Sequence, residues 1–364
     1  MIVLFLTTHL NAGGITSYLF TLCKGLIRQK CSVVIASSGG DQENAFKAIG
    51  AELILVDINV KSELHPKLWK AYQTLKPFCQ KRKCDVIHAQ MRVTQVLGAL
   101  LSQSTKIPLV TTCHGFFKKR LGRILFPCWG KKVIAISEQV QDHLQKDFRV
   151  SLSRISLVHH GIDLRLFTPV DENMRKEFQE KHGLQNKIII GHIGRLSDVK
   201  GQDILIRAMK KVAYIYPQAQ CVIVGQGKEE KALRELVKEY SLEEHVVFFP
   251  VVGQTAHMLR LFNVFVMPSR NEGLGLAVLE AQAMGLPVIV SQVGGLKTLV
   301  EDNVTGYFVP RGNALALAEK IVQVLKNPEQ ARLIGLNARE GVKRQWGSEE
   351  MVRKTLGVYR EVSL

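Results

Sequence analysis

Hydrophobic residues along the chain follow two alternating patterns. Residues 2–7 and 33–37 are short runs rich in β-branched residues, and residues 16–29 between them form an amphipathic stretch. This alternation is typical of β-α-β units. The rhythm restarts past the middle of the chain, where strands are expected at residues 188–193, 221–224, 246–249, 264–267, 287–290 and 307–309. The sequence therefore predicts an α/β protein with two Rossmann-like domains, each containing a doubly wound parallel sheet.

A domain junction is predicted between the two sets of strands. A chain of 364 residues is long for one core and suits two domains of ordinary size. A polar run over residues 170–186 follows residues 158–169, which places the boundary near residue 166. We expect an N-terminal domain at residues 1–166 and a C-terminal domain at residues 167–345. Residues 346–364, with a capping serine at Ser348, are predicted to form a terminal helix.

Positive charge is concentrated in the first half of the chain. The net charge is +17, and residues 1–165 hold 23 Lys and Arg against 10 Asp and Glu, or +13, which leaves 26 against 22, or +4, beyond them. Residues 116–132 interleave cations with aromatic and aliphatic residues, which suits a surface for anionic lipid, a phosphorylated acceptor or nucleic acid, but also an ordinary solvated face. These cations are Lys118, Lys119, Arg120, Arg123, Lys131 and Lys132.

Cysteine usage and hydropathy point to a cytosolic protein. The seven cysteines lack C-x-x-C spacing, which argues against a disulfide framework and against a zinc site. The sequence has no stretch of the roughly 18 to 20 apolar residues that span a bilayer, and its first residues lack a basic segment and a cleavage site.

Candidate binding residues follow the predicted strands, because parallel sheets bind ligands beyond the carboxyl ends of their strands. Arg195 and Lys200 come after the strand at 188–193, and two cations beside a helix start suit a diphosphate. The Gly13-Gly14 pair and His114 occupy similar places in the first half. Gly225 follows the strand at 221–224. It lies in a common type of strand-to-helix turn, which more often has a structural role than a binding role.

The segment from residue 269 to 291 is the most informative. Seven residues separate Glu272 from Glu280, and Glu280 is the only charge between residues 273 and 290. A buried carboxylate requires a partner, and the glycine-rich helix start beside Glu272 offers free N–H groups to an anion. No D-x-D triplet or P-loop occurs. We therefore expect no metal, with diphosphate charge met by Arg195, Lys200 and helix dipoles.

An ordered set of motifs resembles the retaining glycosyltransferases of the GT-B fold, family GT4. The set covers nearly the whole chain, and it implies two Rossmann-like domains facing across a cleft, with the terminal helix returning to the first. The motifs are Gly13-Gly14, Thr112 to Gly115, Ile136 to Glu138, Gly161 to Asp163 with Phe167 and Pro169, Gly194-Arg195-Leu196 with Lys200-Gly201, Val224 to Gly227, Pro268 to Val288, and Gly294-Gly295 to Gly306.

The resemblance implies roles for individual residues. Arg195 and Lys200 would clamp the diphosphate, Glu272 and His114 would contact the donor sugar, and Glu280 would bind the ribose. The other implied donor-binding residues are Gly13, Gly14, Gly225, Gly273, Leu274, Gly275, Leu276 and Ala277. Backbone near residues 251–253 and next to Gly225 would contact the base. The chain departs from the family pattern at Leu274, His160, Lys297 and Thr298.

The implied activity is metal-independent transfer of a hexose-type sugar, with retention, from a nucleotide-diphosphate donor to a lipid-linked or envelope glycan such as lipopolysaccharide. The sugar nucleotide is a co-substrate, and no cofactor is expected. The enzyme would act in the cytoplasm, peripherally at the inner face of the cytoplasmic membrane. Two alternatives stay open: a GT-B sugar-nucleotide epimerase, and a Rossmann-like module that binds nucleic acid through its basic half.

Overall fold

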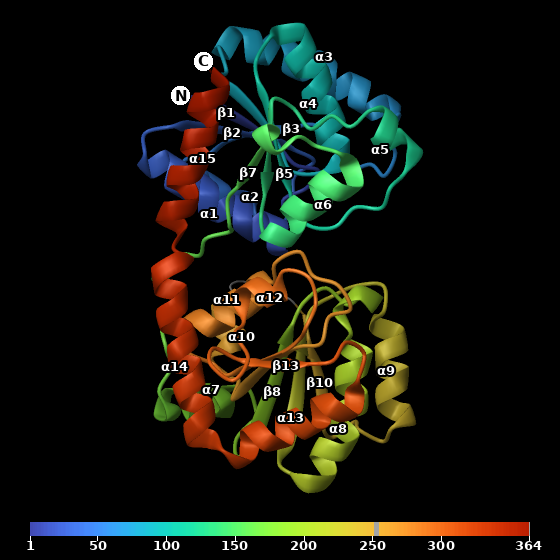
Figure 1. Cartoon of the computed structure of the whole chain (residues 1–364), viewed down its shortest axis with the longest axis vertical. Coiled ribbons are helices and arrows are strands. Elements are labelled where there is room, and N and C mark those ends of the chain that lie inside the picture. Colours follow the sequence, from blue (N-terminus) through green and yellow to red (C-terminus); the bar gives the residue numbers. More distant parts are fainter. Residues whose placement is uncertain (251–254, 364) are drawn as a thin grey trace. The chain divides into compact units, whose positions relative to one another are not determined.

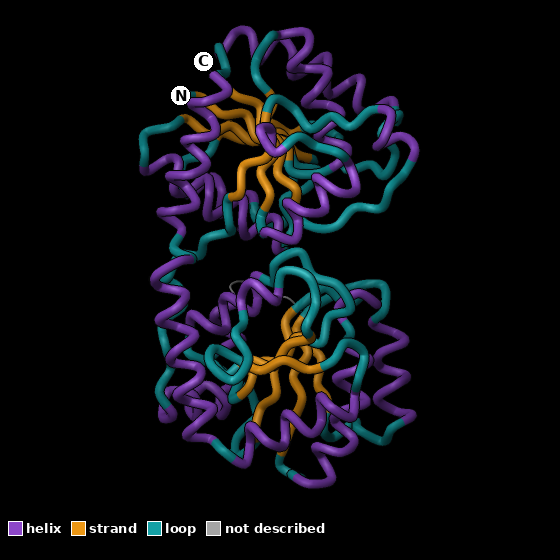
Figure 2. The backbone as a smooth tube through the Cα atoms, viewed as in Figure 1, coloured by secondary structure: helices purple, strands orange, loops and turns teal. Residues whose placement is uncertain are grey.

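The computed structural model describes residues 1–250 and 255–363, and these divide into two compact units. The first unit is Met1–Gly161 with Ser348–Leu364, and the second is Ile162–Gly347. The division thus lies at Gly161, a few residues before the boundary expected near residue 166. Each unit contains one parallel sheet with helices packed against it (Figures 1 and 2). The predicted α/β fold class is confirmed.

The first unit is built on a seven-stranded sheet in the order β3-β2-β1-β4-β5-β6-β7. Its interior strands are almost continuously apolar, because helices cover both faces of a parallel sheet. The strands are β1 (Ile2–Leu6), β2 (Ser32–Ser37), β3 (Glu52–Leu55), β4 (Val86–Ala89), β5 (Leu109–Cys113), β6 (Lys132–Ala135) and β7 (Ile155–Leu157). The helices are α1 (Gly14–Arg28), α2 (Glu43–Ala48), α3 (Pro66–Arg82), α4 (Arg92–Thr105), α5 (Leu121–Leu125), α6 (Glu138–Phe148) and α15 (Ser348–Ser363).

Helix α15 ends the chain but packs in the first unit, alongside α1 (Figure 1). The two helices approach so closely at Gly25 that a β-carbon there would collide with Val352. Further along, the buried Tyr359 hydroxyl lies 2.6 Å from Nδ1 of His88 on β4. Apolar packing and a buried hydrogen bond together join the end of the chain to its first domain.

The second unit is built on a six-stranded sheet in the order β10-β9-β8-β11-β12-β13. The strands are β8 (Ile188–Ile193), β9 (Ala219–Val224), β10 (Val246–Phe249), β11 (Val264–Met267), β12 (Val288–Ser291) and β13 (Tyr307–Val309). The helices are α7 (Glu172–Lys181), α8 (Gln202–Ile215), α9 (Glu230–Glu239), α10 (Thr255–Leu259), α11 (Leu276–Ala283), α12 (Leu296–Leu299), α13 (Ala314–Lys326) and α14 (Pro328–Gln345).

Both sheets reverse their strand order at a central pair. In the first unit the pair is β1 and β4, and in the second it is β8 and β11. In doubly wound folds the crevice beyond the carboxyl ends of such a pair is where ligands bind. The loops after these four strands therefore define where a site is expected in each unit.

None of the described helices is long and apolar enough to span a bilayer.

Candidate functional site

The loops after β8 and β11 bring two opposite charges together in the second unit. Lys200 ends a short 3-10 turn (Asp198–Lys200), and its Nζ lies 2.5 Å from Oε2 of Glu272. The Ser269 hydroxyl lies 3.4 Å from the same oxygen. Both charged side chains are largely shielded, with 22% of Lys200 and 13% of Glu272 exposed. Lys200, which is expected to bind the diphosphate, and Glu272, which is expected to contact the donor sugar, thus meet at the switch point of this sheet.

The turn that carries Lys200 is fixed against the β11 loop by its own backbone. Gly201 follows Lys200 at φ +69°, and a β-carbon there would collide with the carbonyl oxygen of Pro268. Only glycine adopts this conformation at so close an approach without strain. Arg270 adds a second connection, because its guanidinium binds both carboxylate oxygens of Asp203 at 2.8 and 2.7 Å and its backbone N–H donates to Val199.

The backbone at Arg195 is held by a buried hydrogen-bonded chain, while its side chain is exposed. The Gln202 side-chain amide donates to the carbonyl oxygen of Arg195 at 3.0 Å and lies 3.1 Å from Nε2 of His192. Nδ1 of His192 lies 2.9 Å from the carbonyl oxygen of Val266. Burial lowers the pKa of His192 to about 4, so the ring is neutral, and Nε2 accepts while Nδ1 donates.

Glu280 is buried on α11 with 5% of its surface exposed. Burial raises the pKa of this carboxyl to about 7, and a hydrogen bond with Thr255 on α10 partly opposes the shift. Among the described residues, Thr255 therefore supplies a hydroxyl as the partner that this carboxylate was expected to need. A carboxylate accepts more hydrogen bonds than one hydroxyl donates, which leaves capacity for a ligand with vicinal hydroxyls.

The other candidate donor-binding residues of this unit fall into two groups. Gly273, Leu274 and Gly275 are buried before α11, and Leu276 and Ala277 begin that helix half-buried. Gly225 instead packs so tightly on the carbonyl oxygen of Gly194 that a β-carbon would overlap it. Its position fits the structural interpretation of that turn. The expected base contacts near residues 251–253 lie outside the described residues.

In the first unit, Gly13 and Gly14 lie at the start of α1, at the carboxyl end of β1. The space around Gly13 is open, since a β-carbon there would meet no atom within 4 Å. The preceding loop is held by Asp41, which accepts from Ala12 N–H at 2.8 Å, and by Asn11, whose carbonyl accepts from Thr16. The start of α1 therefore presents backbone N–H groups on a fixed loop.

His114, just after β5, is half-buried and packs against the buried rings of Tyr18 and His160. Its Nε2 lies 2.8 Å from Oε1 of Gln90, which follows β4, and its ring centroid lies 5.0 Å from Tyr18 and 5.3 Å from His160. Burial lowers the pKa of His114 to about 3, so the ring is neutral. Its Nδ1, like both ring nitrogens of His160, has no hydrogen-bond partner among the described residues. Gln90 and Tyr18 are not singled out by the sequence analysis.

The six cations between residues 118 and 132 do not form one surface. Lys118, Lys119 and Arg120 are exposed, and Lys119 pairs with Asp147 at 2.8 Å. Arg123 is 8% exposed, so its expected place on an exposed patch is wrong. Its guanidinium carbon lies 3.8 Å from the centroid of Phe117, and burial lowers its pKa to about 10. Attraction to the faces of aromatic rings keeps this cation inside.

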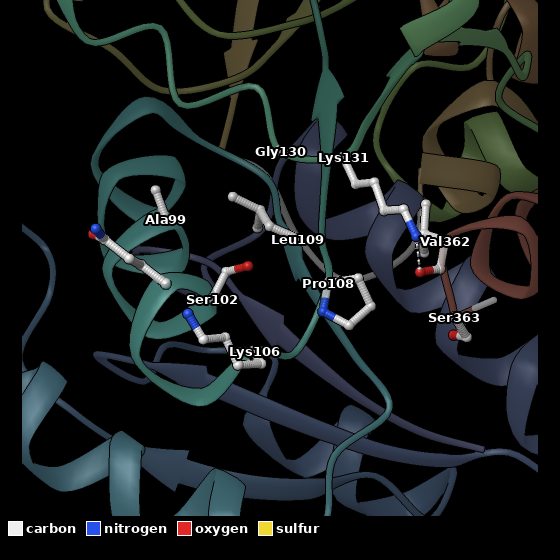
Figure 3. Close-up of a pocket in the computed structure, with 10 residues that line it drawn as sticks. Ala99, Ser102, Lys106, Pro108, Leu109, Gly130, Lys131, Val362 and Ser363 are labelled. Carbon is white, nitrogen blue, oxygen red and sulfur yellow. Dashed lines mark hydrogen bonds between the residues drawn. The ribbon is translucent and has the colours of Figure 1, made fainter.

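Lys131 and Lys132 lie at the amino end of β6, close to the end of α15. Lys131 donates to the Val362 carbonyl oxygen at 2.8 Å, and Lys132 pairs with Glu361 at 2.6 Å. Lys131 also lines a hollow with Lys106 and Leu109 at the amino end of β5 (Figure 3). This is the end of the sheet away from the loops that carry Gly13 and His114, so these two lysines are separate from the candidate site.

Two doubly wound parallel sheets, with the Lys200–Glu272 pair at the switch point of the second, are the architecture found in the GT-B glycosyltransferases. The family model described as Glycosyl transferases group 1 matches residues 174–341, and that of Glycosyltransferase Family 4 matches residues 12–166. The chain belongs to the group 1 glycosyltransferases. The resemblance of the sequence motifs to glycosyltransferases of the GT-B fold is confirmed.

Two named relatives are similar to this chain in sequence over most of their length. N-acetyl-alpha-D-glucosaminyl L-malate synthase of Bacillus anthracis is 28% identical over 295 residues, 78% of this chain and 76% of the relative. D-inositol 3-phosphate glycosyltransferase 1 of Catenulispora acidiphila is 31% identical over 307 residues, 76% of this chain and 72% of the relative.

Solved structures match nearly the whole chain. Anabaena HepE in complex with UDP and glucose gives a TM-score of 0.88 at 22% identity, covering 99% of this chain and 100% of that one. Sucrose-phosphate synthase of Thermosynechococcus elongatus gives a TM-score of 0.86 at 25% identity, covering 99% and 98%.

Proposed function

We propose that this glycosyltransferase takes a hexose-type sugar from a nucleotide-diphosphate donor bound at the carboxyl edge of the second unit's sheet. The observation that carries the proposal is the Lys200–Glu272 pair, 2.5 Å apart, at the switch point of that sheet. A shielded cation suits a diphosphate and a shielded carboxylate suits sugar hydroxyls. HepE is described with UDP and glucose and also with UDP-glucose, which supports a donor of this class.

Each group of the donor other than the base then has a partner. Arg195 and Lys200 hold the diphosphate, the amides at the start of α11 contact the sugar and its phosphates, and Glu280 accepts hydrogen bonds from the ribose hydroxyls. Glu272 exchanges Lys200 for hydroxyls of the sugar when the diphosphate arrives. Nε2–H of the neutral His114 ring donates to Oε1 of Gln90, so its Nδ1 is left to accept a hydrogen bond from a hydroxyl of the donor sugar.

The reaction we propose proceeds on one face of the sugar and retains its anomeric configuration. The bond between the anomeric carbon and the leaving phosphate oxygen breaks, and the acceptor hydroxyl oxygen forms its bond on the same face. The acceptor proton passes to the leaving phosphate oxygen, so no side chain acts as the base. Arg195 and Lys200 stabilise the charge that develops on the diphosphate, which makes a metal ion unnecessary.

For the acceptor we propose a lipid-linked or envelope glycan such as lipopolysaccharide, met at the inner face of the cytoplasmic membrane. Support comes from the first unit, where the exposed cations Lys118, Lys119 and Arg120 lie on the segment after His114. Cations on an exposed segment attract anionic headgroups and phosphorylated glycans. The enzyme is then cytoplasmic and peripheral.

A thermal-shift panel with UDP-, GDP-, ADP- and CMP-sugars tests the donor assignment. A ligand bound only by the folded state raises its stability, so one nucleotide class should raise the melting temperature of the wild type but not of R195A/K200A. R332A/K343A on α14 is the matched control, since it removes the same two charges from exposed ion pairs in the same unit. Equal shifts for both double variants would refute the proposed clamp.

Two further measurements test the reaction. The anomeric configuration of the product, read by proton NMR, should equal that of the donor, and inversion would refute the mechanism. Turnover in the presence of EDTA should equal turnover with added magnesium, and loss of activity in EDTA would refute metal independence.

A further inference from the structure

Helix α5 presents its apolar side chains to solvent. Leu121 is 71% exposed, Ile124 55%, Leu125 62% and Phe126, just after the helix, 69%, whereas Arg123 is 8% exposed. A surface helix in a globular protein has the opposite arrangement, with apolar residues inward and charges outward. Four large apolar side chains within six residues form a contiguous exposed patch of the kind that marks an interaction site.

The inward side of α5 is occupied by Arg123, so the apolar side chains have no room there. The guanidinium carbon lies 3.8 Å from the ring centroid of Phe117, 5.8 Å from that of Trp129 and 6.0 Å from that of Phe148. A cation held over aromatic faces away from water is attracted to them more strongly than one in solvent. Turning the helix over would remove the guanidinium of Arg123 from these rings and lose its cation–π contacts.

A second arginine also holds the helix in place. Arg92, on α4, donates to the carbonyl oxygens of Gly122 at 3.2 Å and of Pro127 at 3.0 Å, and it pairs with Glu63 at 2.6 Å. The chain next to Glu63 continues the apolar surface, since Leu64 is 93% exposed. The contacts of Arg92 and Arg123 together therefore fix the orientation of the segment in the domain.

We propose that residues 118–126, here called the interfacial segment, insert shallowly into the surface of a bilayer that contains anionic lipid. The apolar side chains of α5 and Phe126 enter the acyl boundary, while Lys118, Lys119 and Arg120 lie among the headgroups. Charge complementarity supports this occupant, because the half of the chain that carries the segment has a net charge of +13. The inference rests on the proposed function for its biological meaning, since it names the surface where a lipid-linked acceptor is met.

A bilayer fits the interfacial segment better than a protein partner does. A stable protein interface buries about 800 Å² on each side, drawn from some 20 to 30 residues, which far exceeds one helix of five residues and its neighbours. Insertion into lipid needs no complementary shape, because each side chain adds its own transfer free energy. A patch this small, with charge of one sign at its edge, meets that requirement.

Co-sedimentation with vesicles tests the proposal. The wild type should bind vesicles of phosphatidylcholine with phosphatidylglycerol, and binding should fall with added salt and in vesicles of phosphatidylcholine alone. I124S/F126S should lower the partition coefficient at least about tenfold. L315S/L333S is the matched control, since both leucines are as exposed on α13 and α14, and it should bind as the wild type does. Equal binding by I124S/F126S and the wild type, or no binding by either, would overturn the proposal.

F126W provides a second readout of insertion. Its additional emission should shift to the blue with anionic vesicles, as an indole does on leaving water, and an unchanged spectrum would contradict insertion. Donor-induced thermal shifts of I124S/F126S, measured without vesicles, separate the two proposals. If the donor shifts the melting temperature normally but the wild type does not bind vesicles, only the insertion proposal is refuted. If I124S/F126S in that case also loses turnover on a water-soluble acceptor, the segment would be assigned to acceptor binding. An absent shift in the wild type with normal vesicle binding defeats the donor assignment alone.

Discussion

Lys200 and Glu272 form an ion pair across 72 residues of sequence, with Nζ 2.5 Å from Oε2. The pair joins the loop after β8 to the loop after β11, the two strands at which the second sheet reverses its order. In the protein without donor, each charge therefore satisfies the other. Donor binding replaces this contact with diphosphate and sugar, so the free energy of the pair is subtracted from the affinity for donor.

K200A should lower kcat by about 10²- to 10³-fold, because the cation stabilises charge that grows as the diphosphate leaves. KM for the donor should change much less, since loss of the diphosphate contact is partly offset by release of Glu272. Steady-state kinetics with a saturating acceptor measures both constants. K343A, which removes an exposed lysine from the same unit, should be as active as the wild type. A kcat of K200A within about twofold of the wild type would contradict a role in the transition state.

The raised pKa of Glu280 predicts a pH-dependent stability. Burial raises this pKa from 4.5 to about 7, so between those values the folded protein holds a proton that the unfolded chain has released. The contribution of Glu280 is fully present below about pH 4.5 and is lost as the pH rises to about 7. E280Q has no titrating group at this position, so its stability does not fall in this way as the pH rises. Relative to the wild type it should gain about 3 kcal/mol in free energy of unfolding between about pH 4.5 and pH 8.

Urea unfolding of the wild type and E280Q at both pH values measures this difference. E319Q, at an exposed carboxylate of the same unit, is the control and should follow the wild type at both pH values. A difference between E280Q and the wild type that does not change with pH would show that Glu280 titrates normally. A separate variant, E280A, should chiefly weaken donor binding and leave kcat nearly unchanged. This is expected of a group that binds the ribose equally in the ground state and in the transition state.

Much of the second unit follows from the sequence because its strands are buried on both faces. The predicted runs at 188–193, 246–249, 264–267 and 307–309 coincide with β8, β10, β11 and β13, since parallel strands consist of almost uninterrupted apolar residues. Arg195, Lys200 and Glu272 follow the predicted carboxyl ends of two parallel strands, so the sequence also places them at one edge of a sheet. It does not give the contact between Lys200 and Glu272, which depends on the close approach of Gly201 to Pro268.

Other features depend on contacts that a linear pattern does not contain. Arg123 lies in a run of cations that indicates a solvated surface, and only the packing of Phe117, Trp129 and Phe148 turns it inward. Gln90 follows β4, a strand that includes a histidine and is not among those predicted. The signals available were the aromatic residues between the cations and the apolar residues on either side of His88.

Arg270 is predicted to position Lys200 without touching the donor. Its guanidinium binds Asp203 at 2.7 and 2.8 Å and the carbonyl oxygen of Asp198, two residues before Lys200. R270M should lower kcat about tenfold while the melting temperature changes little, because a half-exposed pair contributes little to stability. R270K should recover only part of the activity, since lysine does not form the two parallel bonds. If R270M had normal kcat, the turn would be fixed by Gly201 alone.

The hydrogen bond between Tyr359 and His88 predicts how strongly α15 is held in the first unit. Both side chains are fully buried, the two atoms are 2.6 Å apart, and Nε2 of His88 lies 2.7 Å from the Thr112 hydroxyl. Y359F removes one hydroxyl and leaves Nδ1 of His88 buried without a partner, which should cost about 1–3 kcal/mol.

V358A, which deletes two buried methyl groups from the same helix, is a packing control. The measurement is hydrogen exchange of the α15 amides together with urea unfolding. Y359F should increase exchange throughout α15, because the bond joins that helix to β4, and V358A shows how much exchange the loss of apolar packing on the same helix produces. Unchanged exchange in Y359F would show that apolar packing against α1 at Gly25 and Val352 is sufficient to hold the helix.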